Sequence, residues 1–151
     1  MSGSRILKID HIGIAVSDLQ EAIARYSGIF GRPPDSQEEV VDQKVRTAFF
    51  AAGESHIELL SPTAEDSPIA RFLEKRGPGI HHICFAVPDI TASLREYEEQ
   101  GIILVDPHPR PGAHGKRVAF LHPKSTGGVL MELSEDANPS VCSRAHTPHS
   151  T

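Results

Sequence analysis

The chain is poor in cysteine, in basic residues relative to acidic ones, and in long apolar segments. Only two of its 151 residues are cysteines, Cys84 and Cys142, which are too few for a disulfide framework and lack metal-knuckle spacing. Lys and Arg number 15 against 20 Asp and Glu, so the basic surplus typical of a nucleic-acid-binding protein is missing. No apolar run approaches the roughly 20 residues that span a bilayer, and the N-terminus lacks a signal-peptide core. We therefore expect a cytoplasmic protein with no nucleic-acid or membrane partner.

The chain instead contains an internal repeat with a constant spacing. Residues 10–18 (DHIGIAVSD) are similar to residues 81–89 (HHICFAVPD), with His11 and His82 71 positions apart. The same spacing relates Ala48-Phe49 to Ala119-Phe120. Towards the end of each copy the spacing becomes 74, from Glu58 to Glu132, so the second copy has three extra residues before its last segment. Chance matches of single residues are common, but a spacing kept over most of the chain indicates a duplication.

Each copy has the pattern of a βαβββ unit. A β-rich run (residues 9–16 and 83–87) is followed by an Asp, Asp18 or Asp89, which is a good helix N-cap. Apolar residues at helical spacing follow, and Gly31 and Gly101 stand where a C-cap glycine is expected. Three shorter strands complete each copy, and we expect them at residues 39–41, 45–51 and 56–60, then at 102–105, 117–121 and 129–133.

These patterns predict one α+β domain over residues 5–135, built from two tandem βαβββ modules. Module one covers 5–62 and module two covers 78–135, with a connecting helix over 67–76 that has Pro68 in its first turn. Residues 137–151 are polar and aperiodic, which predicts a disordered tail. We therefore discount the tail residues His146 and His149 as ligands.

Strand alternation places four potential ligands on equivalent faces of the two copies. His11 and His82 occupy matching positions in the first strand of each copy, and Glu58 and Glu132 do so in the last strand. Imidazole and carboxylate donors suit borderline to hard divalent cations. Each residue taken singly is more often structural, but a matched pair in each repeat favours a metal site, because an unpartnered buried carboxylate is costly.

Two other histidines are excluded on the same grounds. His81 alternates onto the face opposite His82 and aligns with Asp10 in the first copy, so we do not expect it to be a ligand. His56 shares a face with Glu58, but Leu130 takes its place in the second copy, so we do not count it as a ligand either.

With these residues, the chain resembles the vicinal-oxygen-chelate superfamily and, within it, the methylmalonyl-CoA epimerase family. The resemblance covers residues 5–135 and is strongest in the segments DHIGIAV (10–16), IELLSP (57–62), GIHHICFAV (79–87) and HPK through GVLMEL (122–133). It implies a glyoxalase-like curved mixed sheet around a metal site, in a protein that is a homodimer by analogy. It also implies an isomerase that interconverts (R)- and (S)-methylmalonyl-CoA through an enediolate intermediate.

The resemblance further implies roles for individual residues. One divalent ion per chain (Co, Mn, Mg, Zn and Ni are not distinguished) would be bound by the four residues His11, Glu58, His82 and Glu132, and Glu132 would also be the catalytic base or acid. Gln43, in the segment DQKV (42–45), would lie near the substrate. Lys124, in the longer turn of the second copy, would suit the phosphorylated carrier of an acyl-CoA. Some relatives have a second catalytic glutamate where this chain has Thr47.

Three alternative functions are possible for such a site. A glyoxalase I-like lyase uses a similar His/Glu/His/Glu set on a glutathione hemithioacetal. A non-enzymatic binding protein of the same superfamily usually lacks the ligand set. An extradiol-type dioxygenase needs two His and one carboxylate, and usually a longer chain.

Overall fold

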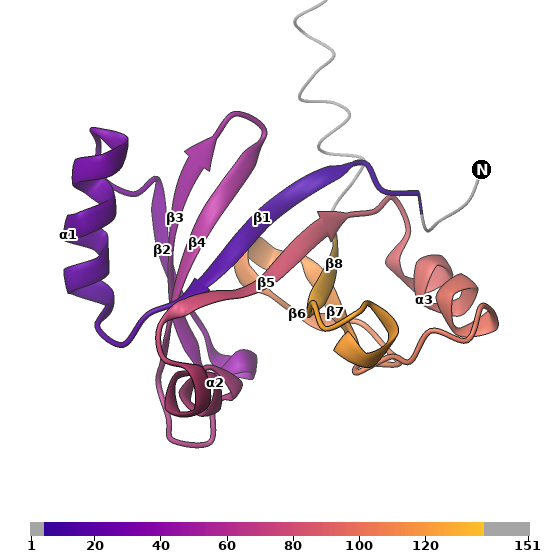
Figure 1. Cartoon of the computed structure of the whole chain (residues 1–151). Coiled ribbons are helices and arrows are strands. Elements are labelled where there is room, and N and C mark those ends of the chain that lie inside the picture. The colour runs from indigo at the N-terminus through magenta and orange to yellow at the C-terminus, as the bar shows by residue number, and fades with distance from the viewer. Residues whose placement is uncertain (1–4, 138–151) are drawn as a thin grey trace, which may run out of the picture.

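The computed structural model describes residues 5–137, which form one eight-stranded sheet and three α-helices (Figure 1). The predicted tail, with Cys142, His146 and His149, lies outside these residues except for Ala137. The strands are β1 (Lys8–Ala15), β2 (Ser36–Val40), β3 (Val45–Ala52), β4 (Ser55–Pro62), β5 (Gly79–Ala86), β6 (Arg110–Pro111), β7 (Arg117–Leu121) and β8 (Met131–Glu135). The helices are α1 (Leu19–Phe30), α2 (Pro68–Arg76) and α3 (Ile90–Glu99), with short 3₁₀ turns η1 (Val41–Gln43), η2 (Ala113–Gly115) and η3 (Pro123–Ser125).

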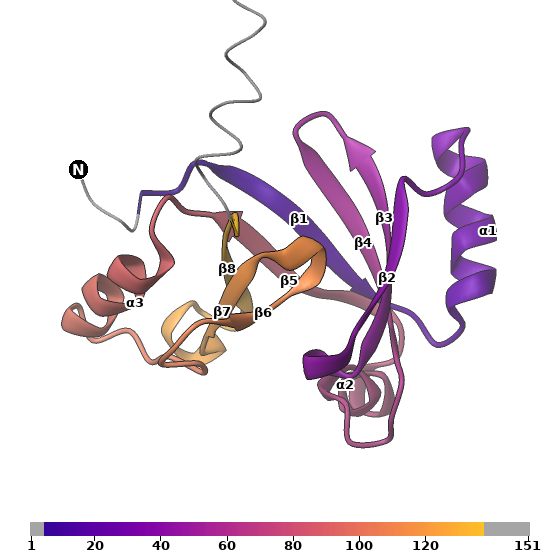
Figure 2. The same ribbon diagram turned by 180° about the vertical axis from the view of Figure 1, so that it is seen from behind.

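The order of the strands in the sheet is β2-β3-β4-β1-β5-β8-β7-β6, which is symmetric about the pair β1 and β5. In each half the first strand pairs in parallel with the last, β1 with β4 and β5 with β8, whereas β1 and β5 pair antiparallel. The sheet is therefore mixed, and the two halves turn towards each other in both views (Figures 1 and 2). The predicted α+β fold with a curved mixed sheet is confirmed.

The helices cover the outer faces of the two halves. α1 packs on β3 and β4, α3 packs on β7 and β8, and the two helices lie at opposite ends of the molecule (Figures 1 and 2). As predicted, Asp18 and Asp89 cap them, each accepting a backbone N–H bond at 3.1 Å. Under each helix lies an apolar cluster centred on the fully buried Phe50 and Ile90, respectively. The inner, concave face is left for polar side chains.

The predicted strand at 102–105 is wrong. Only an isolated bridge between Leu104 and Leu121 forms there, and the edge strand of module two is the short β6. The segment after it contains Pro107, Pro109 and Pro111, which have no backbone N–H to donate to a neighbouring strand. The apolar residues of 102–105 that suggested a strand instead include Ile102 and Leu104, which pack against the cluster under α3.

Candidate metal centre and substrate cavity

Four side chains from the four central strands meet on the concave face. His11 comes from β1, Glu58 from β4, His82 from β5 and Glu132 from β8, and they are 7%, 5%, 3% and 3% exposed. The Nε2 atom of His11 lies 3.1 Å from His82 Nε2, from Glu58 Oε1 and from Glu132 Oε1. His82 Nε2 lies 3.5 Å from Glu58 Oε1 and 3.1 Å from Glu132 Oε1. The structure thus brings together all four residues that the repeat predicted as ligands.

The spacing of His11, His82 and Glu132 fits a small divalent cation, and these three form one of the two groups of potential ligands found among residues 5–137. Adjacent donors of a tetrahedral or octahedral ion bound at about 2.0–2.2 Å lie roughly 2.8–3.6 Å apart. The three distances within this group are 3.1 Å, and Glu58 Oε1 lies 3.1 and 3.5 Å from the two imidazole nitrogens. The adjoining cavity, about 20 Å³ and lined by His11, Glu58 and Glu132, has room for about one water-sized body.

One atom of the group lacks a partner in the part of the chain that the structure describes. Glu132 Oε1 is buried and has no hydrogen-bond partner, although two imidazole nitrogens lie 3.1 Å away. A buried carboxylate oxygen without a hydrogen bond costs free energy, and a bound cation would remove that cost. His11, His82 and Glu58 are the donors that would share such an ion with Glu132.

Neighbouring side chains and one glycine determine where the two imidazole rings lie. Phe49 on β3 packs edge-on to His11, and Phe120, its counterpart on β7, packs edge-on to His82. Across β1, Gly13 faces His82, and a Cβ atom at Gly13 would lie only 2.2 Å from the His82 Cε1 atom. Only glycine leaves room for the ring at this point of the strand.

Two β-bulges place a supporting residue beside each ring. The β1–β5 register shifts between Ile9 and His11, which leaves Asp10 without an opposite residue, and again at His81. Asp10 Oδ1 accepts a bond of 2.8 Å from His11 Nδ1, and His81 Nδ1 lies 2.9 Å from His82 Nδ1. The expectation that His81 lies on the opposite face from His82 is therefore wrong, because strict alternation fails at a bulge.

The two supporting residues differ in charge. Burial raises the pKa of the Asp10 carboxyl, but hydrogen bonds from His11 and from Lys116 outweigh burial and hold it well below its usual range. Lys116 Nζ donates to Asp10 Oδ2 at 2.6 Å. Burial, with repulsion from His82, lowers the pKa of His81 to about 4, so this imidazole is neutral at pH 7. If His82 Nε2 is a metal ligand, its Nδ1–H donates to His81. Metal-bound histidines commonly donate their other N–H in this way.

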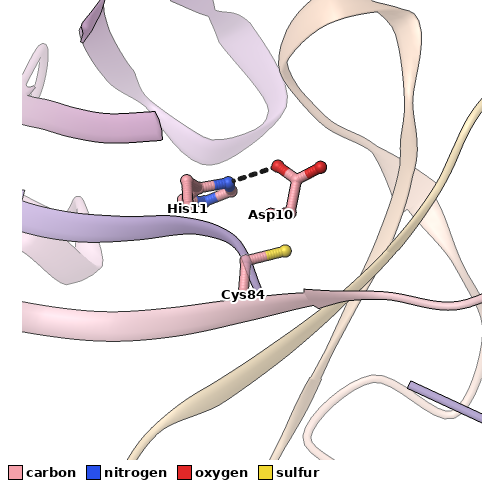
Figure 3. A group of neighbouring side chains, drawn as sticks. All are labelled: Asp10, His11 and Cys84. Carbon is pink, nitrogen blue, oxygen red and sulfur yellow. Dashed lines mark hydrogen bonds and ion pairs between the residues drawn. The ribbon is translucent and has the colours of Figure 1, made fainter. Parts of the chain in front are cut away.

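A second cluster of potential ligands lies on the other side of His11. Figure 3 shows the Cys84 thiol on β5 directed to the side on which Asp10 and His11 lie. Burial raises the pKa of Cys84 to about 12, so it is a thiol and not a thiolate at pH 7. Asp10 is already bonded to His11 and to Lys116. This arrangement supports the orientation of His11 and is a poor metal site.

Three cavities meet at the ligand cluster. The small one beside His11 shares Gln43 with an apolar cavity of about 130 Å³ that includes Val45, Leu60 and Phe120. That cavity shares four lining residues with an open groove of about 600 Å³, namely Pro68, His81, His82 and Leu130. A small-molecule site typically has a volume of about 300–1,000 Å³, so the groove is large enough for a substrate that reaches the ligand cluster at His82.

The remaining residues named from the sequence have different positions. Gln43, at the end of η1, lines both smaller cavities, as expected of a substrate-binding residue. Lys124 is exposed in η3 and lines none of the three cavities, although its neighbour Pro123 lines the groove. Thr47 is buried on β3, and its hydroxyl donates to the Glu38 carbonyl oxygen at 3.1 Å. His56 belongs to neither group of potential ligands among residues 5–137.

Sequence reasoning missed several residues that shape the site. Asp10, His81 and Lys116 were not assigned roles, and neither was the glycine at position 13. The matching positions of Asp10 and His81 in the two repeats were the one available signal, because both directly precede a predicted ligand. Lys116 is 106 residues from Asp10 in the chain, and no sequence pattern connects the two.

Comparison with known proteins gives the family of this chain. Residues 10–120 match the model of the glyoxalase/bleomycin resistance protein/dioxygenase superfamily. The chain belongs to this superfamily. The resemblance to methylmalonyl-CoA epimerases is also confirmed. The ethylmalonyl-CoA/methylmalonyl-CoA epimerase of Cereibacter sphaeroides is 43% identical over 130 residues, which are 85% of this chain and 97% of that one.

Solved structures of such enzymes have the same fold. The methylmalonyl-CoA epimerase of Mycobacterium tuberculosis matches with a TM-score of 0.86 and 40% identity, over 94% of this chain and 96% of that one. A variant of the Streptomyces coelicolor methylmalonyl-CoA epimerase, in complex with 2-nitronate-propionyl-CoA, matches with a TM-score of 0.85 and 37% identity over 88% of this chain and 96% of that one. Within residues 5–137, no helix of this superfamily member is long and apolar enough to cross a membrane.

Proposed function

We propose that this chain is a metal-dependent methylmalonyl-CoA epimerase. The observation that carries the proposal is the convergence of His11, Glu58, His82 and Glu132, of which His82 also lines an open groove. Its relatives of 37% to 43% identity are epimerases of methylmalonyl-CoA, and they match most of the chain. The four side chains would bind one divalent ion, and the groove would admit an acyl-CoA.

The chemistry requires stabilisation of negative charge next to an existing carboxylate. The proton at C2 of methylmalonyl-CoA is only weakly acidic, because its removal places charge on an already anionic group. A divalent ion in the site would stabilise that charge, an effect of several kcal/mol in a water-poor cavity. Gln43, which lies between the two smaller cavities, would hold the substrate in place with its amide.

Glu132 is the residue best placed to move the proton. It lines the small cavity and its Oε1 has no hydrogen-bond partner among residues 5–137. Attraction to the charged forms of His82 and His11 outweighs burial and lowers the pKa of Glu132, so the carboxylate is ionised and can accept a proton. Thr47 has no titrating group and its hydroxyl is bonded to the Glu38 carbonyl oxygen. The proton exchange on the second face of the intermediate therefore belongs to another group or to water.

The alternatives have less support. A glyoxalase I-like lyase would use the same donor set, but the relatives at 43% and 40% identity are epimerases. A binding protein without a metal would not need Glu132 Oε1 to be buried without a partner. A cytoplasmic location and a homodimer are further parts of this proposal. They are supported by the low cysteine count and by analogy with small members of the superfamily, respectively.

Solvent deuterium exchange at C2 of methylmalonyl-CoA tests the proposal. The protein loaded with a divalent metal should incorporate deuterium at C2 and racemise the substrate, and removal of the metal with a chelator should stop both. Metal re-addition should restore them. The hemithioacetal of methylglyoxal and glutathione serves as the comparison substrate. Conversion of the hemithioacetal without exchange on methylmalonyl-CoA would replace the epimerase by the lyase.

A further inference from the structure

We propose that the groove beside α2 binds the phosphate-bearing nucleotide end of coenzyme A through Arg71, Lys75 and Arg76. This inference rests on the proposed function, because it assigns the carrier part of the same substrate. All three side chains line the groove of about 600 Å³, and all three are exposed. They come from a single helix of nine residues in a chain with a net charge of −5, so the positive charge here is local and not a property of the whole surface.

The cations of α2 are exposed at the groove because the apolar face of this helix packs against the sheet. Ile69, Phe72 and Leu73 have the i, i+3, i+4 spacing of a helix face and pack in an apolar cluster with residues of β1, β2, β3 and β4. Arg71 and Lys75 are four residues apart and therefore neighbours on the helix surface. The Arg76 guanidinium lies over the Phe72 ring, 5.8 Å from its centre, which fixes it at the edge of the groove.

No close ion pair neutralises these cations. Within residues 5–137, no carboxylate oxygen lies within 4.0 Å of the charged groups of Arg71, Lys75 or Arg76. Most other groove-lining residues are apolar or aromatic, and they include Ile80 and Val129, which are 63% and 40% exposed. A ligand with an extended, largely uncharged arm and phosphates at one end would cover these apolar side chains and pair with the cations.

The groove also extends to the proposed metal site. His82, one of the four proposed metal ligands, lines it, as does the supporting residue His81. A thioester at the metal centre would therefore extend its pantetheine arm past Leu130 and Ile80 towards α2. The apolar cavity of about 130 Å³ beside His82 would remain for the acyl part of the substrate.

This assignment differs from the one that the sequence suggested. Lys124 was expected to bind the phosphorylated carrier, but its side chain is exposed on η3 and lines no part of the groove. The three cations of α2 line it directly. A phosphate monoester such as the 3′-phosphate carries about −1.5 to −2 charges at neutral pH, and phosphate oxygens form strong charge-assisted bonds with Arg and Lys. The diphosphate and 3′-phosphate of coenzyme A match a cluster of three cations.

The test compares two substrates that differ only in the nucleotide end. Methylmalonyl-CoA and methylmalonyl-pantetheine present the same reacting atoms and the same pantetheine arm, but the second lacks all phosphates. The variant R71Q/K75Q/R76Q removes the charges and keeps good helix formers. The ratio of kcat/KM on the CoA substrate to kcat/KM on the truncated one should fall by on the order of 10- to 100-fold, because hydrogen bonds to charged groups contribute about 1.5–3 kcal/mol. The fall should come from KM.

A variant with the same change of net charge elsewhere serves as the control. K8Q/R25Q/R95Q removes three cations that do not line the groove and should leave the ratio within about twofold, since none of them can contact a ligand bound there. An unchanged ratio in the α2 variant, or an equal fall in both variants, would overturn the assignment. A proportional loss on both substrates would also overturn it, because it would indicate a structural role for α2.

A binding measurement separates this inference from the proposed function. Adenosine 3′,5′-bisphosphate, which contains no thioester, should bind to the wild-type protein in calorimetry, and the α2 variant should lose that binding. If the wild-type protein epimerises neither thioester but still binds the bisphosphate at α2, the proposed function fails and the nucleotide site stands. If the bisphosphate binds equally to both proteins, the nucleotide site fails whatever the activity.

Discussion

The two modules build their halves of the site from equivalent residues but support them differently. Each supplies a histidine from its first strand, a glutamate from its last strand and a phenylalanine that packs edge-on to the imidazole. In module one, His11 is bonded to an ionised aspartate, which is bonded in turn to Lys116. In module two, His82 faces the neutral His81. Duplication thus repeats the ligands but not the charge behind them.

The supporting residues of the two histidines differ in charge, and the two histidines also line different cavities. His11 lines only the small cavity beside the donor atoms, whereas His82 and His81 line both the apolar cavity and the groove. The charged pair of Asp10 and Lys116 lines this small cavity and neither of the two larger ones. A neutral imidazole can instead lie beside an apolar substrate cavity without the cost of a buried charge. Module one therefore fixes the metal centre, and module two opens it to the substrate.

The largest expected effect is one that the two modules share. His11→Ala and His82→Ala each remove one of the four donors and should lower metal affinity by more than the roughly 10- to 100-fold that is typical of lost supporting residues. Epimerase activity should disappear in both. Metal content after dialysis and deuterium exchange at C2 measure the two effects. Retention of stoichiometric metal by either variant would exclude that histidine as a ligand.

The two glutamates should differ more than the two histidines. Glu132→Gln keeps an oxygen donor but removes the titrating group, so turnover should fall by about 10²–10⁴-fold, the usual contribution of a general acid or base, while metal is retained. Glu58→Gln also keeps an oxygen donor and should retain metal and partial activity. Equal losses of turnover in the two variants at equal metal occupancy would contradict this division of roles.

Gly13 and Cys84 occupy the same position in the two modules, and each lies opposite the histidine of the other module. In Gly13→Ala, the new methyl group would overlap the His82 ring, with 2.2 Å to its Cε1 atom, so the ring must move. Metal affinity should fall by on the order of 10- to 100-fold, the range for residues that orient a ligand. Gly28→Ala on α1 is the control. It has open space around it and should raise stability by roughly 0.5–1 kcal/mol without affecting the metal.

The features that could be predicted from the sequence are those that follow a regular pattern along the chain. The repeat spacing, the helix caps and the alternation along β1, β4, β5 and β8 predicted the fold and brought out His11, Glu58, His82 and Glu132, because these features are periodic. Alternation failed at His81 because a bulge cannot be seen in a periodic pattern. The strand at 102–105 failed because prolines after it prevented regular pairing. The groove cations on α2 depend on which face of that helix packs inwards, which only the tertiary structure shows.

The supporting residues provide a smaller contrast between the modules. Asp10→Asn removes the negative charge that holds His11 and breaks its ion pair with Lys116, so metal affinity should fall by about 10- to 100-fold. His81→Ala opens space in which water can accept the His82 Nδ1–H, since His81 borders two cavities. Its effect on metal affinity should be less than about tenfold, within the lower part of the same range. Metal titrations of the two variants give both values. If His81→Ala releases the metal and Asp10→Asn does not, the contrast between the two modules is reversed.

The smallest effect is expected at Cys84, and it decides between the two clusters of potential ligands around His11. Burial raises the pKa of this thiol to about 12, and a protonated thiol is a weak ligand. Cys84→Ala should therefore change metal affinity and turnover by no more than about twofold. Its cost should be confined to stability, at roughly 1 kcal/mol, as for a typical substitution in a packed interior.

A thiolate–metal bond would give a different result. Cobalt substituted into the wild-type protein would show sulfur-to-metal charge-transfer absorption that the alanine variant lacks. That difference, together with metal loss in Cys84→Ala, would move the ion to the side of His11 on which Asp10 lies. Identical cobalt spectra of the two proteins would leave it among the four strands at the centre of the sheet.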